Sequence, residues 1–246
     1  MNKLPAITLS FWIMKICATT LGETAGDLLS MTMNVGYAVS SAILLSFFFA
    51  TLIVQLSSKM FHPIIYWSVI LATSTAGTTM SDYMDRTLGL GYATGSLILA
   101  SLLVTTLIIW KITEKSLSVT NIRSIRGEVF YWTAILFSNT LGTALGDFLA
   151  DNSGLGFAGG ALLIGSLLAL IVLAYYFSKV SHVILFWLAF VLTRPFGATF
   201  GDLLTKTQDK GGLNFGTIGS SIILFTILVV LIINSIIKLN KQIKTA

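Results

Sequence analysis

The 246-residue sequence predicts an all-α fold, a polytopic membrane helical bundle of eight transmembrane helices built from four parallel two-helix repeats. Three observations predict this fold class. Hydrophobic residues make up 55% of the chain and charged residues only 10%, whereas soluble domains carry about 25% charged residues. Several apolar stretches approach the ~20 residues that one bilayer crossing requires. Finally, one pattern recurs four times along the chain.

The repeat is aligned on a tryptophan. In each copy a glycine lies ten residues after the tryptophan and an aspartate lies fifteen residues after it. A second apolar stretch then begins at or near another glycine, five residues later in the fourth copy than in the others. The aligned residues are Trp12, Trp67, Trp132 and Trp187; Gly22, Gly77, Gly142 and Gly197; Asp27, Asp82, Asp147 and Asp202; and Gly36, Gly91, Gly156 and Gly216.

The spacing of the tryptophans divides the chain into two pseudo-symmetric halves. The spacings are 55, 65 and 55 residues, and the longer middle one contains a hydrophilic linker, residues 111–128. The first half (1–120) holds repeats one and two, and the second half (121–246) holds repeats three and four. Each copy supplies two spans, predicted at residues 6–29, 36–57, 64–84, 91–112, 129–150, 155–178, 182–205 and 214–238.

The lysines and arginines predict the orientation of these spans. Ten lie on the side of the termini and three on the opposite side, so both termini are expected in the cytoplasm. The repeated tryptophans then fall at the cytoplasmic interface, where aromatic belts occur. The ten are Lys3, Lys59, Lys111, Lys115, Arg123, Arg126, Lys179, Lys238, Lys241 and Lys244, and the three are Arg86, Lys206 and Lys210. A formal net charge of +5 therefore indicates topology and not a nucleic-acid partner.

The four repeated aspartates are the main functional candidates. Fifteen residues of helix place each of them about 22 Å across the membrane from its tryptophan. Carboxylates inside a membrane are costly and usually functional, and hard cations prefer oxygen ligands. The candidate metal ligands are Asp27, Asp82, Asp147, Asp202 and Glu23. The alternative is that each aspartate only ends its helix at the outer headgroups.

The residues four, seven and eight positions before each aspartate lie on the same helical face as that aspartate. In three copies they are mostly hydroxyl or carboxamide residues, and we expect a wet, cation-tolerant path lined by Thr20, Thr75, Thr78, Thr140, Thr143 and Asn139. The fourth copy has Arg194 and Pro195 instead. The proline is expected to kink or break its helix. Arg194 requires an acidic partner, for which Asp27, Asp147 and Glu23 remain open.

Two further patterns concern packing. Pairs of small residues four apart, such as Gly22 and Gly26, let helix backbones approach closely in lipid. We therefore expect the first helices of the four repeats to surround an axis, with the second helices outside them. Lys15 is expected to extend to the cytoplasmic interface.

Four aspartates and Glu23, offset by Arg194 alone, carry more negative charge than a pore for a neutral solute would need.

Four tandem two-span repeats, each with a tryptophan followed by G-x-x-x-(G/S)-D, resemble a bacterial membrane-protein family defined by a four-fold repeat of unknown function. The resemblance covers almost the whole chain and implies an inner-membrane location, but no activity. The Gly-Asp pairs ending at Asp27, Asp147 and Asp202 are also similar to the Glu-x-Gly-Asp motifs of calcium–manganese exchangers. Those copies lack the motif's glutamate, and Glu23 is one residue out of register.

The leading hypothesis is a secondary transporter or exporter of a small cation, with Mn²⁺ or another divalent ion ahead of monovalent ions. The alternatives are a proton-coupled permease for an organic solute, with Arg194 holding an anionic group, and a structural or sensory membrane module. No enzyme motif is found, and no permanently bound cofactor is expected. The single Cys17 excludes an internal disulfide. The expected partners are the lipid bilayer and the transported cation, with a homodimer as an alternative to a monomer.

Overall fold

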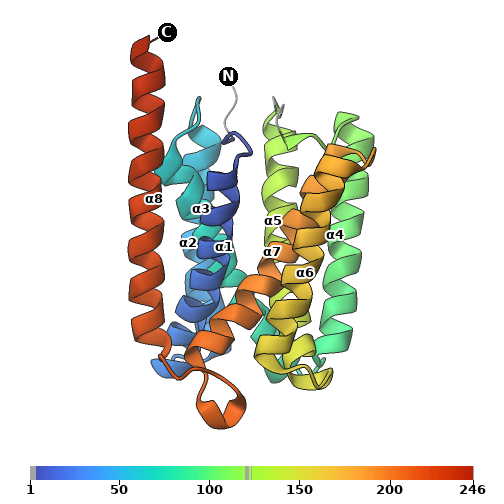
Figure 1. The fold of residues 1–246 in the computed structure, drawn as a ribbon, viewed down its shortest axis with the longest axis vertical. Helices are drawn as coiled ribbons and strands as arrows, with labels where there is room; N and C mark the ends of the chain where they lie inside the picture. The colour runs from blue at the N-terminus through green and yellow to red at the C-terminus, as the bar shows by residue number, and fades with distance from the viewer. Residues whose placement is uncertain (1–3, 120–121, 123, 246) are drawn as a thin grey trace.

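The structure, a computed structural model, describes residues 4–119, 122 and 124–245. Within these residues it has eight α-helices and no strand, which confirms the predicted all-α fold of eight helices. The helices run along the long axis of the bundle at different tilts (Figure 1). They are α1 (Leu9–Asp27), α2 (Tyr37–Ser57), α3 (Pro63–Asp82), α4 (Tyr92–Glu114), α5 (Ile125–Asp147), α6 (Gly156–Phe177), α7 (His182–Thr205) and α8 (Thr217–Thr245).

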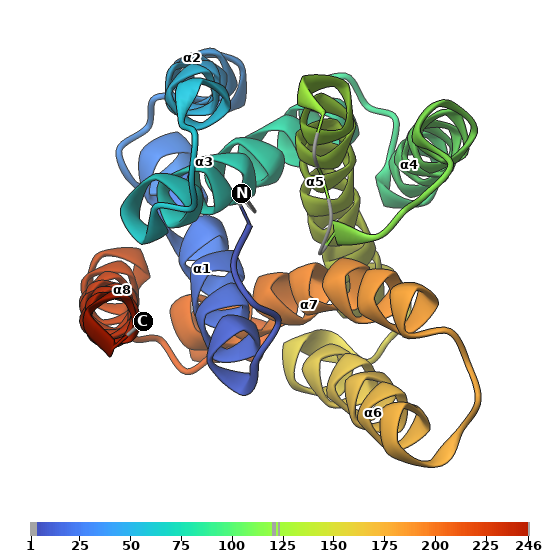
Figure 2. The same cartoon turned by 90° about the horizontal axis from the view of Figure 1, so that it is seen from above.

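The first helices of the four repeats form an inner ring. Helices α1, α3, α5 and α7 surround a common axis, each in contact with the next and α7 with α1 (Figure 2). The second helices lie outside this ring, as the small-residue pattern predicts. Helix α2 packs on α3, α4 on α5, α6 on α7 and α8 on α1. Each outer helix thus covers the first helix of the following repeat, and α8 closes the circle.

The bundle has two distinct ends. The start of α1, the end of α8 and the connections between repeats lie at one end, here called the terminal end (Figure 1). The connections within the repeats lie at the other, here called the loop end. Two residues of the orientation argument, Lys3 and Arg123, lie outside the described residues, and the side chain of Lys244 is not described either.

Five of the described helices are long and apolar enough to cross a membrane: α2, α4, α6, α7 and α8. Their outer faces are rich in exposed Leu, Ile, Val and Phe. The other three, α1, α3 and α5, are less apolar because they carry the threonines, glycines and carboxylates that are buried around the axis. The sequence pattern of eight spans thus corresponds to eight helices, of which five have the composition of a span.

Glycines explain how closely the inner helices pack. A Cβ on Gly22 would lie 2.3 Å from Ser74 Cβ, and one on Gly77 would lie 3.0 Å from the backbone of α5. A Cβ on the equivalent Gly142 would clash with Arg194, and one on Gly197 would clash with Thr19. The same close contact therefore occurs around the whole ring. Any larger side chain at these positions would force the helices apart.

The repeated tryptophans form an aromatic layer near the terminal end. The aromatic residue before each tryptophan contacts the tryptophan of the next repeat: Phe11 with Trp67, Tyr66 with Trp132, Tyr131 with Trp187, and Phe186 with Trp12. Trp67 and Trp132 are 1% and 0% exposed and Trp187 is also buried. The expectation of an interfacial belt is therefore wrong for these three. Their rings pack the repeats together, whereas Trp12 is only partly buried.

The turn that follows each aspartate differs in the fourth repeat. In the first three copies a five-residue π-helical turn begins directly after the aspartate. In the fourth, α7 stays α-helical to Thr205 and passes through Pro195 without a break, so of the two expected outcomes the broken helix is wrong. The glycines before the outer helices, Gly36, Gly91, Gly156 and Gly216, all have positive φ angles (82°, 71°, 65° and 73°). This conformation favours glycine and explains its repetition there.

Candidate functional site

Three axial layers of polar residues line the inside of the ring. Counted back from the aspartate, they lie at positions eight, four and zero, so they follow one face of each inner helix. The layer nearest the terminal end contains Thr19, Ser74, Asn139 and Arg194. The middle layer contains Glu23, Thr78, Thr143 and Ala198. The layer nearest the loop end contains Asp27, Asp82, Asp147 and Asp202.

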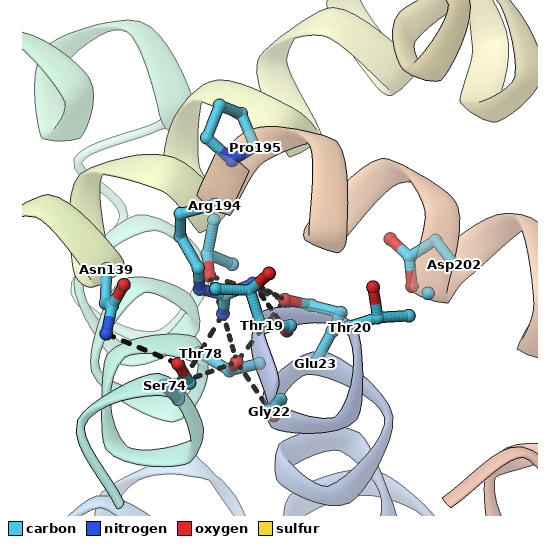
Figure 3. Close-up of polar contacts among 12 residues, drawn as sticks. Thr19, Thr20, Gly22, Glu23, Ser74, Thr78, Asn139, Arg194, Pro195 and Asp202 are labelled. Atoms are coloured by element: carbon cyan, nitrogen blue, oxygen red, sulfur yellow. Dashed lines mark hydrogen bonds and ion pairs between the residues drawn. The ribbon is translucent and has the colours of Figure 1, made fainter. Parts of the chain in front are cut away.

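Arg194 joins all four inner helices. Its side chain is 0% exposed, and its Nη1 atom donates to Glu23 Oε2 at 2.9 Å. Its Nη2 atom donates to the hydroxyl oxygens of Thr78 and Thr143, each at 2.6 Å. Longer bonds reach the carbonyl oxygens of Thr19 and Ser74, both at 3.4 Å (Figure 3). Of the three acidic partners left open by the sequence, the structure selects Glu23.

Glu23 is the acceptor at the centre of the middle layer. Besides the guanidinium, its Oε2 atom accepts from the hydroxyls of Thr78 at 3.3 Å and Thr143 at 3.4 Å. Gly201 of α7 packs directly on the Glu23 side chain, so α1 and α7 are in close contact at this level. An ion pair therefore occupies the axis between the aspartates and the terminal end.

Lys15 lies on the same axis and not at the interface. Its side chain is 0% exposed, its Nζ atom donates to Asn139 Oδ1 at 3.3 Å, and it stands 4.0 Å from the centroid of the Phe190 ring. The expectation that it extends to the membrane surface is wrong. Residues 15, 19, 23 and 27 are each four apart, so they share one face of α1, and that face points inward.

Two cations from the loop end bridge the four aspartates in pairs. Arg86 contacts Asp82 through Nε at 2.7 Å and Asp147 through Nη2 at 3.2 Å. Lys206 contacts Asp202 at 3.0 Å and Asp27 at 2.5 Å. Burial disfavours the charged amine, but the Asp202 and Asp27 carboxylates outweigh it and raise the pKa of Lys206, which therefore remains protonated.

These cations change the charge balance expected for the axis. Five carboxylates face four basic groups, Arg194, Lys15, Arg86 and Lys206, among the described residues. The expectation that Arg194 alone offsets the five carboxylates is therefore wrong, because Arg86 and Lys206 also pair with the aspartates. The bonds from Arg86 to Asp147, from Lys206 to Asp27 and from Arg194 to Glu23 each join one sequence half to the other.

Three of the predicted ligands come close enough together to share an ion. One carboxylate oxygen from each of Glu23, Asp147 and Asp202 lies within 4.8 Å of the other two. Oxygens bound to one hard cation at 2.3–2.6 Å are at most about 5 Å apart, so this group has the required spacing. All three side chains are buried and come from three different helices. Asp27 and Asp82 belong to the same layer but lie outside this group.

The predicted path residues divide into two sets. Thr78, Thr143 and Asn139 face the axis and bind Arg194, Glu23 or Lys15. The hydroxyls of Thr20, Thr75 and Thr140 instead donate to carbonyl oxygens of their own helices, at 2.9, 3.2 and 2.9 Å. Such bonds satisfy a threonine inside an apolar helix without a ligand. That these three line a path stays a prediction.

Sequence reasoning missed the roles of Arg86 and Lys206, which it used only to orient the chain. A signal for both was present. Each lies four residues after the aspartate of its repeat, on the same helical face, and the two are 120 residues apart. The same position holds Met31 in the first repeat and Asp151 in the third. Only the second repeat of each half therefore supplies a cation to the aspartate layer.

Comparisons with known proteins recover the same repeat. The model of a family described as a Repeat of Unknown Function (DUF347) matches the chain four times, at residues 10–61, 65–116, 130–181 and 185–237. These matches cover most of the sequence, and each contains one tryptophan-to-aspartate segment. No curated protein and no solved structure matches the chain.

Proposed function

The chain belongs to the DUF347 repeat family, and from the geometry of its site we propose that it is a secondary transporter or exporter of a small cation, with a divalent ion such as Mn²⁺ favoured. The proposed location is the bacterial inner membrane. Support for a membrane comes from five span-like helices and from the exposed apolar side chains of the outer helices. The lysine and arginine distribution favours cytoplasmic termini.

The observation that carries this proposal is the group of buried carboxylates from Glu23, Asp147 and Asp202, whose oxygens lie within 4.8 Å of one another. Buried acidic groups in a membrane are retained where they bind or relay ions. Asp27 and Asp82 lie in the same layer as Asp147 and Asp202 and add two carboxylates to the site at that level. Oxygen ligands of this kind suit hard divalent cations.

The ring also supports a mechanism of alternating access. The ion pairs between the sequence halves all lie at the site, so binding a cation to Glu23 or Asp147 competes with bonds that hold the halves together. Movement of repeats one and two against repeats three and four would then open the site to one side at a time. Because the four repeats close within one chain, the proposed unit of transport is the monomer.

The organic-solute alternative gains no support from Arg194. Its two Nη atoms are already bound by Glu23, two threonine hydroxyls and two carbonyl groups. An organic anion would have to displace these partners to bind either Nη atom. The contacts therefore favour Arg194 as part of the resting structure and not as an open anion site.

The proposal is tested by thermal stability of the detergent-purified protein against Mn²⁺, Ca²⁺, Mg²⁺, Zn²⁺, Na⁺ and K⁺. A ligand that binds only the folded state stabilises it, by about 2.7 kcal/mol at a hundred times its Kd. We expect a selective shift with a divalent ion that Asp147→Asn removes. The control is Asp209→Asn, which neutralises an exposed loop carboxylate.

The same variants are then compared for ion uptake in proteoliposomes. We expect Asp147→Asn to lose uptake and Asp209→Asn to retain it. Equal stabilisation and uptake by Asp147→Asn and the unmodified protein would remove this carboxylate from the mechanism. Stabilisation by organic anions and by none of the metal ions would instead favour the permease.

A further inference from the structure

Lys206 holds a position in the site that a small cation would also occupy. Its Nζ atom lies between carboxylates of two neighbouring helices, at 3.0 Å from Asp202 Oδ1 and 2.5 Å from Asp27 Oδ2. An ammonium group is a compact point charge with no fixed plane. Carboxylate oxygens around such a charge form the same kind of ligand set that a metal ion uses.

The pseudo-symmetric cation, Arg86, is held differently. Two nitrogens of its planar guanidinium contact two carboxylates, and its Cζ atom stands 5.5 Å from the centroid of the Tyr92 ring. Such a group is orientated by several contacts at once. Lys206 has one charged atom and no ring contact of this kind among the described residues. The departure of Lys206 breaks two carboxylate contacts and one 4.0 Å contact with Met31 Sδ, and its single charged atom needs no fixed orientation to be replaced by an ion.

Lys206 is also placed to move toward solvent. It directly follows the last residue of α7, its side chain is 18% exposed, and residues 207–211 after it are exposed. Counted from the aspartate to the next repeated glycine, the stretch from Asp202 to Gly216 is five residues longer than its counterparts in the other repeats. The ammonium therefore lies at the loop-end boundary of the aspartate layer, between that layer and solvent.

We propose that Lys206 is a tethered competitor for the transported cation: its ammonium fills the position between Asp27 and Asp202, and a cation enters the site from the loop end by displacing it. This inference rests on the proposed cation transport and adds a determinant of selectivity. Replacing one unit of charge with another gains little Coulomb energy, whereas a divalent ion brings twice the charge to the same carboxylates. Lys206 thus favours divalent over monovalent ions.

The first experiment measures the ion concentration that gives half-maximal thermal stabilisation of the full-length protein, with Mn²⁺ and Na⁺ as probes. For Lys206→Gln we expect the Mn²⁺ concentration to fall at least about tenfold, because a unit charge a few ångströms from the ion is removed. We also expect stabilisation by Na⁺ to appear. Lys206→Arg retains the charge and should show no such gain in Mn²⁺ or Na⁺ stabilisation. Lys210→Gln removes a charge from the same exposed segment and should match the unmodified protein within about threefold.

The second experiment needs no variant. Amine-reactive labelling of the unmodified protein, read by peptide mass spectrometry, reports whether Lys206 leaves its carboxylates. Mn²⁺ at a stabilising concentration should raise the labelling of Lys206 several-fold and leave that of Lys210 unchanged. Unchanged labelling of Lys206 would overturn the proposal even if Lys206→Gln did not fold.

The outcomes separate this inference from the function on which it rests. If Asp147→Asn abolishes Mn²⁺ stabilisation while Lys206→Gln matches the unmodified protein, cation binding stands and the competitor role is wrong. If neither the unmodified protein nor Lys206→Gln is stabilised by any ion, both are wrong. Tighter Mn²⁺ binding by Lys206→Gln alone, with unchanged Lys210→Gln, supports both.

Discussion

Replacing Arg194 with methionine tests whether the axial ion pair holds the ring together. The substitution keeps a long unbranched side chain but removes the guanidinium that binds Glu23, Thr78 and Thr143. Glu23 would then be a buried carboxylate with only two hydroxyl donors among the contacts described. The loss of stability comes mainly from the Glu23 charge that is left without its cationic partner. The apolar contacts contribute little to it, because methionine largely retains them.

The magnitude follows from the burial of both partners. Removing one member of a buried ion pair costs about 3–5 kcal/mol, and for a chain of this size each kcal/mol lowers the unfolding temperature by roughly 2–4 °C. We therefore expect Arg194→Met to lower the unfolding midpoint by roughly 6–20 °C. Intrinsic tryptophan fluorescence of the detergent-purified protein reports this transition, since Trp67 and Trp132 are buried in the aromatic layer.

A second substitution distinguishes a stranded charge from lost packing. Adding Glu23→Gln to Arg194→Met removes the uncompensated charge and keeps an oxygen that accepts from Thr78 and Thr143. We expect the double variant to recover to within about 1–2 kcal/mol of the unmodified protein. Arg126→Met, at an exposed arginine of α5, should change stability by less than about 0.5 kcal/mol. A double variant less stable than either single variant would refute the reasoning.

Two further predictions concern packing and pH. A Cβ on Gly77 would lie 3.0 Å from the backbone of α5, whereas one on Gly219 would meet nothing within 4 Å. In the same unfolding assay, Gly77→Ala should therefore lower the stability by about 1–3 kcal/mol. Gly219→Ala should raise it by about 0.5–1 kcal/mol. Equal effects would contradict the close packing of the ring. Burial raises the pKa of Asp85, in the turn after α3, to about 6, although the Ser81 hydroxyl and Arg86 lower it. The folded protein then keeps a proton that the unfolded chain releases above about pH 4. The free energy of unfolding should therefore fall as the pH rises from about 4 to about 6, by up to about 1.4 kcal/mol per pH unit. Asp85→Asn should flatten this fall, and an unchanged pH profile would contradict the assignment.

Much of the fold could be predicted because the repeat is expressed in residues with few alternatives. Gly22 and Gly77 admit no larger side chain where the inner helices cross, and Gly36 and Gly91 adopt positive φ angles at the start of the outer helices. Such constraints are local, so they leave the same residue at the same register in every copy. The burial of Trp67 was not predictable in this way, because an aromatic layer between helices and an aromatic belt at an interface require the same residue type.

The site was harder to predict because its contacts join different repeats. The four-residue spacing places Lys15 and Glu23 on one face of α1, but it does not say which helix that face meets. The partner of Arg194 depended on the packing order of the ring, which brings α1 beside α7 only when the fourth repeat closes on the first. Arg86 and Lys206 could be recognised as equivalent by their spacing, but their second aspartates lie on the next inner helix and follow only from the fold.

The order of charges along the axis sets a requirement for the proposed transport. From the loop end a cation first meets the aspartates with Lys206 and Arg86, then Glu23, and beyond it the guanidinium of Arg194 and the amine of Lys15. Carboxylates attract the ion, but the buried positive charge of Arg194 repels it. Because Arg194 holds Glu23, an ion that takes over the Glu23 carboxylate also releases the guanidinium from its strongest partner. Passage toward the terminal end therefore requires Arg194 to leave the axis, and ion binding at Glu23 is the event that weakens its hold.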